Sequence, residues 1–151
     1  MKLIAFYLIV LLISLTCLIV QNLFGQLVVG HDSLQIGLMC ALIGGVGGCI
    51  YCLRAIYLNA CVRKQWDDEW LPWYYIRPIV SIACGGVSYL FLRAGLLILE
   101  SGTHSDSTDL GFYALAFIAG LNVDKFISKI EDIAQAVWGI EKSRTSSGKG
   151  D

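Results

Sequence analysis

Apolar residues dominate four stretches of the chain, and polar residues gather between them. Uncharged apolar runs cover residues 3–23, 36–53 and 79–92, and the last continues through Arg93 to Leu99. A helix needs roughly 20 mostly apolar residues to cross the hydrocarbon core of a bilayer. The pattern therefore predicts an all-α membrane protein with transmembrane helices at about 3–23, 36–58, 77–99 and 110–123.

The fourth stretch is the shortest of these predicted spans. Residues 110–123 would cover only about 21 Å at 1.5 Å per residue, whereas the hydrocarbon core is roughly 30 Å thick. The helix can still cross if protein covers its polar neighbours. We therefore expect residues 1–123 to form a four-helix transmembrane domain.

A second pattern starts within the fourth span and runs beyond it. Apolar residues recur at alternating steps of three and four, and no proline interrupts the run. The positions of this seam are Ala116, Ala119, Val123, Phe126, Ile130, Ile133, Val137 and Ile140. Such heptad spacing predicts that one helix leaves the membrane and continues as a cytoplasmic amphipathic helix over residues 124–140.

Two arrangements would cover the cytoplasmic part of this seam. The last helices of several subunits could gather in a parallel bundle, or each could lie flat with its apolar face in the inner leaflet. The polar face is balanced in sign, which weakens the flat arrangement, whereas Trp138 favours it. Residues 141–151 are small, polar and charged, so we expect a disordered tail.

Composition and charge support this membrane architecture and orient it. Of the 151 residues, 56% are hydrophobic and only 15% are charged, which is unusual for a water-soluble domain. All of the 11 Lys and Arg residues except Arg93 lie before the first span, around the second connection or after the fourth span. Because positive charge is retained in the cytoplasm, both termini are predicted to be cytoplasmic. A cleaved signal peptide is the alternative for the first run, but no small-x-small cleavage site follows it.

The six cysteines do not predict disulfide bonds. Five of them lie within predicted spans, and none lies in an outer connection. Cys49 and Cys52 have the spacing of a redox or metal motif, but they lie in an apolar helix without a histidine or a second pair. We expect the cysteines to act as small buried apolar residues.

Small residues recur in the second predicted span at intervals of four. Its glycine and alanine rows, together with one glycine of the third span, comprise Gly37, Ala41, Gly44, Gly45, Gly48 and Gly85. Small side chains at this spacing let membrane helices approach closely. We expect the second and third spans to pack on each other, with a subunit interface as the alternative.

The inner connection before the third span is rich in aromatic residues. Trp66, Trp70 and Trp73 would share one face of a short helix, which predicts a segment anchored by its rings at the inner headgroup level. A ligand cage built from the same rings is the alternative. Pro78 would then lie in the first turn of the third helix.

Arg93 is the one charge inside a predicted apolar span. Such a residue implies a partner or a water-lined cavity. Glu100 lies about two turns later on nearly the same face, and Asp106 or Asp109 could also reach it. An ion pair within the subunit is one interpretation, and a ring of Arg93 side chains around an oligomer axis that selects anions or gates a pore is the other. At the end of the fourth span, Asn122 and Asp124 with Lys125 suggest helix-edge hydrogen bonds and an intersubunit ion pair.

The sequence carries no catalytic motif. The predicted outer connections hold possible ligands for a divalent cation, namely His31, Asp32, Glu100, His104, Asp106 and Asp109, but loop composition accounts for them. No nucleophile with a base, phosphate-binding loop, zinc ligand set or nucleic-acid-binding patch is visible. We therefore predict no enzyme, no metal, no cofactor and no nucleic-acid partner. The lipid bilayer, further copies of the chain and a cytoplasmic protein are the candidate partners.

Two segments, "IRPIVSIACGGVSYLFLRAGLL" and "YALAFIAGLNVDKFISKIEDIAQAVWGIEKSR", resemble parts of a scattered group of small bacterial inner-membrane proteins. That group has an Arg in the third of four spans and a similar end to the fourth. The resemblance, over residues 76–144, implies a bacterial four-helix inner-membrane protein and no particular activity.

Two hypotheses for function follow from these patterns. The first is a homo-oligomeric pore-forming or membrane-perturbing protein, and an analogy with four-span modules of antiviral systems suggests a role in bacterial defence. The second is a non-conducting membrane anchor or scaffold that presents its C-terminal helix to a cytoplasmic partner.

Overall fold

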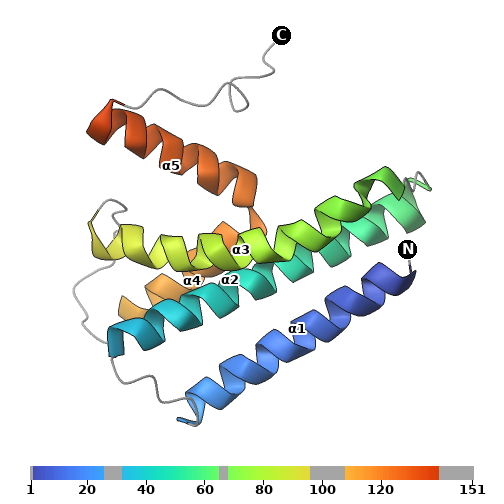
Figure 1. Ribbon diagram of the computed structural model, residues 1–151, viewed down its shortest axis with the longest axis horizontal. Coiled ribbons are helices and arrows are strands. Elements are labelled where there is room, and N and C mark those ends of the chain that lie inside the picture. The colour runs from blue at the N-terminus through green and yellow to red at the C-terminus, as the bar shows by residue number, and fades with distance from the viewer. Residues whose placement is uncertain (1, 26–31, 65–67, 96–107, 140–151) are drawn as a thin grey trace.

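The described part of the chain is entirely helical. The computed structural model describes residues 2–25, 32–64, 68–95 and 108–139 (Figure 1). The α-helices in these ranges are α1 (Lys2–Leu23), α2 (Asp32–Tyr57), α3 (Leu71–Arg93), α4 (Thr108–Leu121) and α5 (Val123–Trp138). A π-helical turn, Leu58–Val62, extends α2, and a 3-10 turn, Asp68–Trp70, leads into α3.

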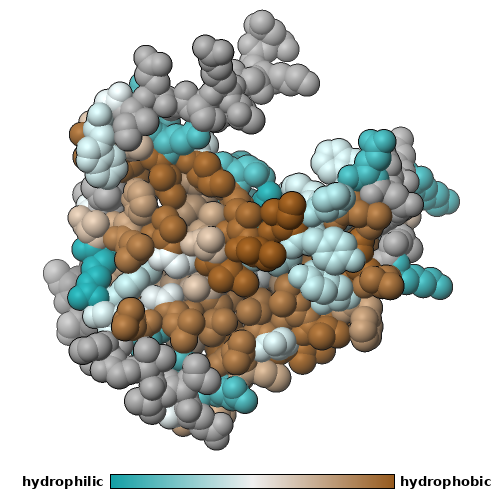
Figure 2. Space-filling model, in the orientation of Figure 1, coloured by the Kyte–Doolittle hydropathy of each residue, from teal (hydrophilic) through white to brown (hydrophobic). Residues whose placement is uncertain are grey.

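Three of these helices are long and apolar enough to cross a membrane, namely α1, α2 with its extension, and α3. The bent pair of α4 and α5 gives a fourth span if it is counted as one. The prediction of an all-α protein with several apolar helices of membrane-spanning length is therefore confirmed. Figure 2 shows apolar surface across the middle of the molecule, with hydrophilic side chains gathered toward its ends and on α5.

Helix α2 lies at the centre of the bundle, where it packs on α1, α3 and α4. The closest contacts are made where α2, α3 and α4 meet at glycines. A Cβ atom added to Gly44 would lie 2.6 Å from the carbonyl oxygen of Ser81, and one added to Gly47 would lie 2.6 Å from that of Phe117. Gly120 of α4 lies directly against the backbone of Gly44. Only residues without a side chain allow these three helices to come so close.

Other small residues of the predicted packing set lie at neighbouring contacts. Gly37 faces the ring of Tyr89, Gly45 faces Ile82 and Leu15, and Gly48 faces Ser81. Gly85 lies against the backbone of α2. By contrast, a Cβ atom added to Gly86 would lie 3.7 Å from the Cβ atom of Ala41, which is an ordinary contact distance. The spacing of small residues in the sequence thus corresponds to real close approaches between helices.

Helix α1 packs in a different way, through larger side chains at the edge of the bundle. Ile4 and Leu8 are buried in a cluster with Cys52, Ile56 and Tyr74. The opposite face of α1 is apolar and exposed, and it includes Leu3, Phe6, Ile9, Val10 and Ile13. An exposed apolar face of this length is one that lipid can cover.

The third helix begins earlier than the sequence predicted. It starts at Leu71 instead of residue 77, and Pro72 occupies its first turn, where a missing N–H does little harm. Pro78 lies inside the helix. The predicted separate interfacial helix is therefore wrong for the described residues, because Trp70 ends a 3-10 turn and Trp73 belongs to α3. Trp66 and residues 96–99 lie outside the described part.

The prediction that one continuous helix carries the apolar seam is wrong. Helix α4 ends at Leu121, α5 begins at Val123, and the axis bends by 111° between them. Asn122 has φ −122° and ψ 54°, which are not helical values. The heptad pattern specifies an apolar face, but it does not require that the helix remain straight.

A contact with α3 explains why the chain can break here without a proline. In an unbroken helix the carbonyl of Gly120 would accept the amide N–H of Asp124. In the structure this carbonyl accepts a hydrogen bond from Ser81 Oγ at 3.0 Å. The backbone of α4 is thus held on α3 immediately before the bend.

Candidate functional site

The most heavily buried charge in the described residues is Arg77, which lies six residues after the start of α3. Its side chain is only 5% exposed, and Nη1 donates to Asp124 Oδ2 at 2.8 Å. Asp124 lies in the first turn of α5, where a carboxylate is also favoured by the helix dipole. This ion pair fixes the first turn of α5, just after the bend, to the bundle.

Two aromatic rings complete the surroundings of the Arg77 guanidinium. The guanidinium carbon lies 4.7 Å from the ring centroid of Tyr51 on α2 and 5.1 Å from that of Trp73, one turn earlier on α3. The Trp73 ring in turn packs edge-on against Tyr74 at 5.1 Å. Cation–π contacts of this kind stabilise a desolvated cation by about 2 kcal/mol. We call Arg77, Tyr51, Trp73 and Asp124 the arginine cluster.

The two charges of the cluster are unequally buried. The Asp124 side chain is 79% exposed, so most of its carboxylate remains available to solvent. Arg77 Nε is buried and has no hydrogen-bond partner within the described part of the chain. The cation therefore depends on one carboxylate and two rings. Such an arrangement is suited to fixing the start of α5 to the bundle, because the planar guanidinium can bond to a carboxylate and stack on rings at the same time.

Arg93, the cation that the sequence analysis singled out, has looser surroundings. It is the last residue of α3 and is exposed. Its Nη1 donates to the hydroxyl of Tyr89 at 2.7 Å, and its guanidinium carbon lies 6.0 Å from the same ring. Tyr89 itself is buried and packs edge-on against Phe112 of α4 at 5.5 Å. Glu100, the predicted partner, lies outside the described residues.

The residues of the predicted seam divide between the two sides of the bend. Ala116, Ala119 and Val123 are buried in contacts with α2 and α3. Phe126, Ile130 and Ile133 are half-buried, and Val137 is 52% exposed. Ile140 lies outside the described residues. The first part of the seam is therefore buried in the core of the single chain, and the side chains of the part on α5 become progressively more exposed.

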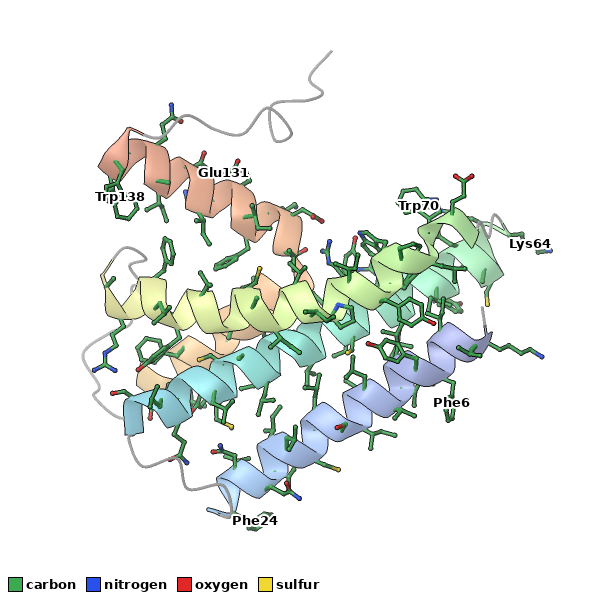
Figure 3. The ribbon with its side chains drawn as sticks, in the orientation of Figure 1. Phe6, Phe24, Lys64, Trp70, Glu131 and Trp138 are labelled. Atoms are coloured by element: carbon green, nitrogen blue, oxygen red, sulfur yellow. The ribbon has the colours of Figure 1, made fainter. Side chains whose placement is uncertain are left out.

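The two described tryptophans of the predicted anchor set also differ. Trp73 packs against Tyr51, with ring centroids 5.9 Å apart, and belongs to the arginine cluster. Trp70 is 61% exposed, and Figure 3 shows it at the end of the molecule where Lys64 also lies. Only Trp70 has the exposure expected of an interface anchor.

The polar side of α5 borders a second feature. Asp124, Lys125, Ser128, Lys129 and Asp132 line a shallow hollow of about 390 Å³. Both signs of charge are present, so the hollow has no strong preference for a cation or an anion. Among the described residues, no group of three His, Cys, Asp or Glu side chains could hold a metal ion.

Sequence reasoning assigned Arg77 to the basic flank of the inner connection and missed its role. A usable signal was present, because Trp73 precedes Arg77 by one helical turn and places a ring beside the cation. Asp124 was recognised as a marker of the helix end, and the structure pairs it with Arg77 of the same chain. The predicted intersubunit pair stays a prediction.

No protein family, no curated protein and no solved structure matches this chain.

Proposed function

We propose that the chain is a non-conducting membrane anchor of the bacterial inner membrane, with both termini cytoplasmic, that holds α5 at its inner face for a cytoplasmic partner. The observation that carries this proposal is the ion pair between Arg77 and Asp124. A buried cation that fixes the first turn of a helix to the bundle controls the direction in which that helix leaves. A helix held in a fixed orientation presents a defined binding surface to a partner, as a scaffold requires.

The angle of the bend supports an arrangement in which α5 lies along the membrane. With α4 close to the membrane normal, a bend of 111° directs α5 within about 20° of the membrane plane. The half-buried Phe126, Ile130 and Ile133 would then rest on the bundle and the inner leaflet. Lys125 and Lys129 are exposed and would remain accessible from the cytoplasm.

The centre of the bundle supports a protein that does not conduct on its own. The glycine contacts bring α2, α3 and α4 together with the backbone of Gly44 against Gly85 and Gly120. At these contacts the helices touch through their backbones and leave no space for hydrated ions. Conduction would therefore require a pathway between several copies of the chain.

A homo-oligomeric pore is the second candidate, and the charged hollow on α5 favours it. If several copies placed Lys125, Lys129 and Asp132 around a common axis, these side chains would form a polar lining. Under this hypothesis the apolar face of α1 would contact neighbouring subunits instead of lipid.

Ion flux through the purified protein in liposomes tests the two candidates. If the protein is an anchor, the ion flux should equal that of protein-free liposomes at every ratio of protein to lipid. The Lys129→Glu variant should give the same result. A flux that rises with protein content, and whose ion selectivity changes in Lys129→Glu, would overturn the anchor in favour of the pore. A matched variant is Lys64→Glu, because Lys64 is exposed at the end of the bundle and away from α5.

Reporter fusions test the proposed orientation. A reporter that is active only in the cytoplasm should be active when fused after Trp138 and inactive when fused after Gly95. The opposite result would place α5 on the other side of the membrane and remove a cytoplasmic partner from consideration.

A further inference from the structure

A polar pocket lies between α1, α2 and α4, near the end of the bundle that holds Asn22 and the start of α4. Its volume is about 330 Å³, which is at the lower end of the range for small-molecule sites. Its lining consists of Asn22, Leu23, Gln35, Ile36, Met39, Asp109 and Tyr113. Neither the arginine cluster nor α5 contributes to it.

Asn22 gives this pocket a hydrogen-bond donor that no described residue pairs. Its side chain is only 4% exposed, although it lies at the end of a mostly apolar helix. Asn22 Oδ1 accepts a hydrogen bond from Gln35 Nε2 at 3.1 Å, which fixes the orientation of the amide. Its Nδ2 is buried and has no hydrogen-bond partner among the residues that the structure describes. Since buried donors are almost always paired, this amide is placed for an acceptor that a ligand would supply.

Asp109 gives the same pocket a negative charge. It lies in the first turn of α4, and Tyr113 lies one turn later on the same face. No Lys or Arg of the three helices that form the pocket lies near this negative charge in sequence. Helix α4 has none, and the basic residues of α1 and α2 are Lys2 and Arg54, both remote in sequence from the lining residues. Arg93, on α3, donates to Tyr89.

Leu23, Ile36 and Met39 form the apolar part of the lining. A ligand that fits all of these groups needs a cationic hydrogen-bond donor for Asp109, an acceptor oxygen for Asn22 Nδ2 and a short apolar connection between them. Asp109 would accept from the cation, and Asn22 would donate to the oxygen.

We propose that this pocket binds a protonated primary amine that carries a nearby oxygen acceptor, as in an ethanolamine group. The ammonium lies on the Asp109 carboxylate, the oxygen accepts from Asn22 Nδ2, and the methylene groups contact Ile36 and Met39. This chemistry occurs in the headgroup of an ethanolamine phospholipid and in free ethanolamine or phosphoethanolamine. The site is independent of the proposed anchor function, because it requires nothing of α5.

Ligand-induced stabilisation of the purified full-length protein in detergent tests the site. The probes are short-chain phosphatidylethanolamine, phosphatidylcholine with the same acyl chains, and free ethanolamine and phosphoethanolamine. The primary amine should raise the unfolding temperature in a saturable manner, and the choline lipid should not, since its quaternary ammonium cannot donate to Asp109. Stabilisation by the lipid alone identifies a membrane source, and stabilisation by the free amines identifies a soluble one.

Two variants make the test specific. Asp109→Asn is nearly isosteric and should weaken binding of the amine at least about tenfold, and Asn22→Leu should remove the contact with the oxygen. Asp132→Asn makes the same acid-to-amide change on α5 and should leave binding unchanged. Equal stabilisation by the ethanolamine and choline lipids, no stabilisation by any amine, or full amine selectivity retained in Asp109→Asn would each overturn the proposal.

Discussion

The two described arginines of α3 lie toward opposite ends of the helix and have opposite surroundings. The Arg77 side chain is only 5% exposed, and it contacts one carboxylate and two aromatic rings. Arg93 is exposed at the last residue of the helix and bonds to one tyrosine on the same helix. The first joins three helices, whereas the second is a local contact.

This difference shows that isolation in the sequence does not identify the structurally important charge. Arg93 stands out because a long apolar run precedes it. Arg77 does not, because it lies at the edge of its span and follows the aromatic residues of the connection. A buried charge is tolerated where other segments bring it partners, and those segments are distant in the chain. Tyr51 and Asp124 come from α2 and α5 and meet only in the folded bundle.

The largest effect is expected at the glycine contact that lies between the two arginines and positions both. Gly85→Ala would push a methyl group against the backbone of α2, including the Cα of Gly44 at 2.9 Å. Overpacking against rigid backbone should destabilise the bundle by about 3 kcal/mol. Reversible unfolding in mixed micelles, followed by circular dichroism, measures this change.

The adjacent glycine provides a matched control on the same helix. A Cβ added to Gly86 meets only the Ala41 side chain at 3.7 Å, an ordinary contact distance. Gly86→Ala should therefore leave the free energy of unfolding within about 0.5 kcal/mol, or raise it slightly, because alanine favours helix. Equal losses in both variants would mean that α2 and α3 do not pack through Gly85.

Removal of the carboxylate of the arginine cluster should have the next largest effect. Asp124→Asn leaves the buried Arg77 cation without its counter-charge, at an expected cost of about 2 kcal/mol. This is below the usual range for a buried pair, because Asp124 is largely exposed and the two rings remain. Lys125→Gln, at the next position, is the control and should have little effect.

The asymmetry of the ion pair predicts an unusual double-mutant result. Arg77→Met should cost less than Asp124→Asn, because the exposed carboxylate that it leaves can be solvated. The double variant should be more stable than Asp124→Asn alone, since the unpaired buried cation is gone. Additive losses in the same unfolding assay would show that the two residues are not coupled.

The sequence predicted the helical class and the membrane-spanning composition because both depend on hydrophobic pattern. The rows of small residues in the second and third spans also pointed to positions, such as Gly44 and Gly85, that lie at real contacts. These features are properties of single helices. Each can be recognised from residues within a few turns of one another.

The bend at Asn122 and the arginine cluster could not be predicted in this way. The seam from Ala116 onward keeps its apolar spacing through Asn122, so periodicity alone indicates one continuous helix. What accompanies the break is a hydrogen bond from Ser81 and an ion pair from Arg77, both supplied by α3. The spacing of Trp73 and Arg77 is the one local sign of the cluster. The contacts with Tyr51 and Asp124 come from segments distant in sequence, and such contacts leave no local pattern.

A smaller effect is expected from the aromatic side of the comparison. Trp73→Leu removes one of the two rings beside Arg77 and the edge-on contact with Tyr74, at an expected cost of about 1.5 kcal/mol. Trp70→Leu changes an exposed side chain three residues earlier and should cost under about 0.5 kcal/mol in detergent. Similar losses in the free energy of unfolding for the two variants would contradict the assignment of Trp73, but not Trp70, to the arginine cluster.

The smallest effect should come from Arg93 itself. Arg93→Gln removes a hydrogen bond to Tyr89 and a distant contact with its ring, but Tyr89 remains packed against Phe112. Because the arginine is exposed at the helix end, the loss should stay within about 0.5 kcal/mol. Tyr89→Phe, which keeps the ring and removes only the hydroxyl, should match it in the same unfolding assay. A loss in Arg93→Gln as large as that in Asp124→Asn would mean that Arg93 has a strong partner beyond Tyr89, and it would reverse the ranking of the two arginines.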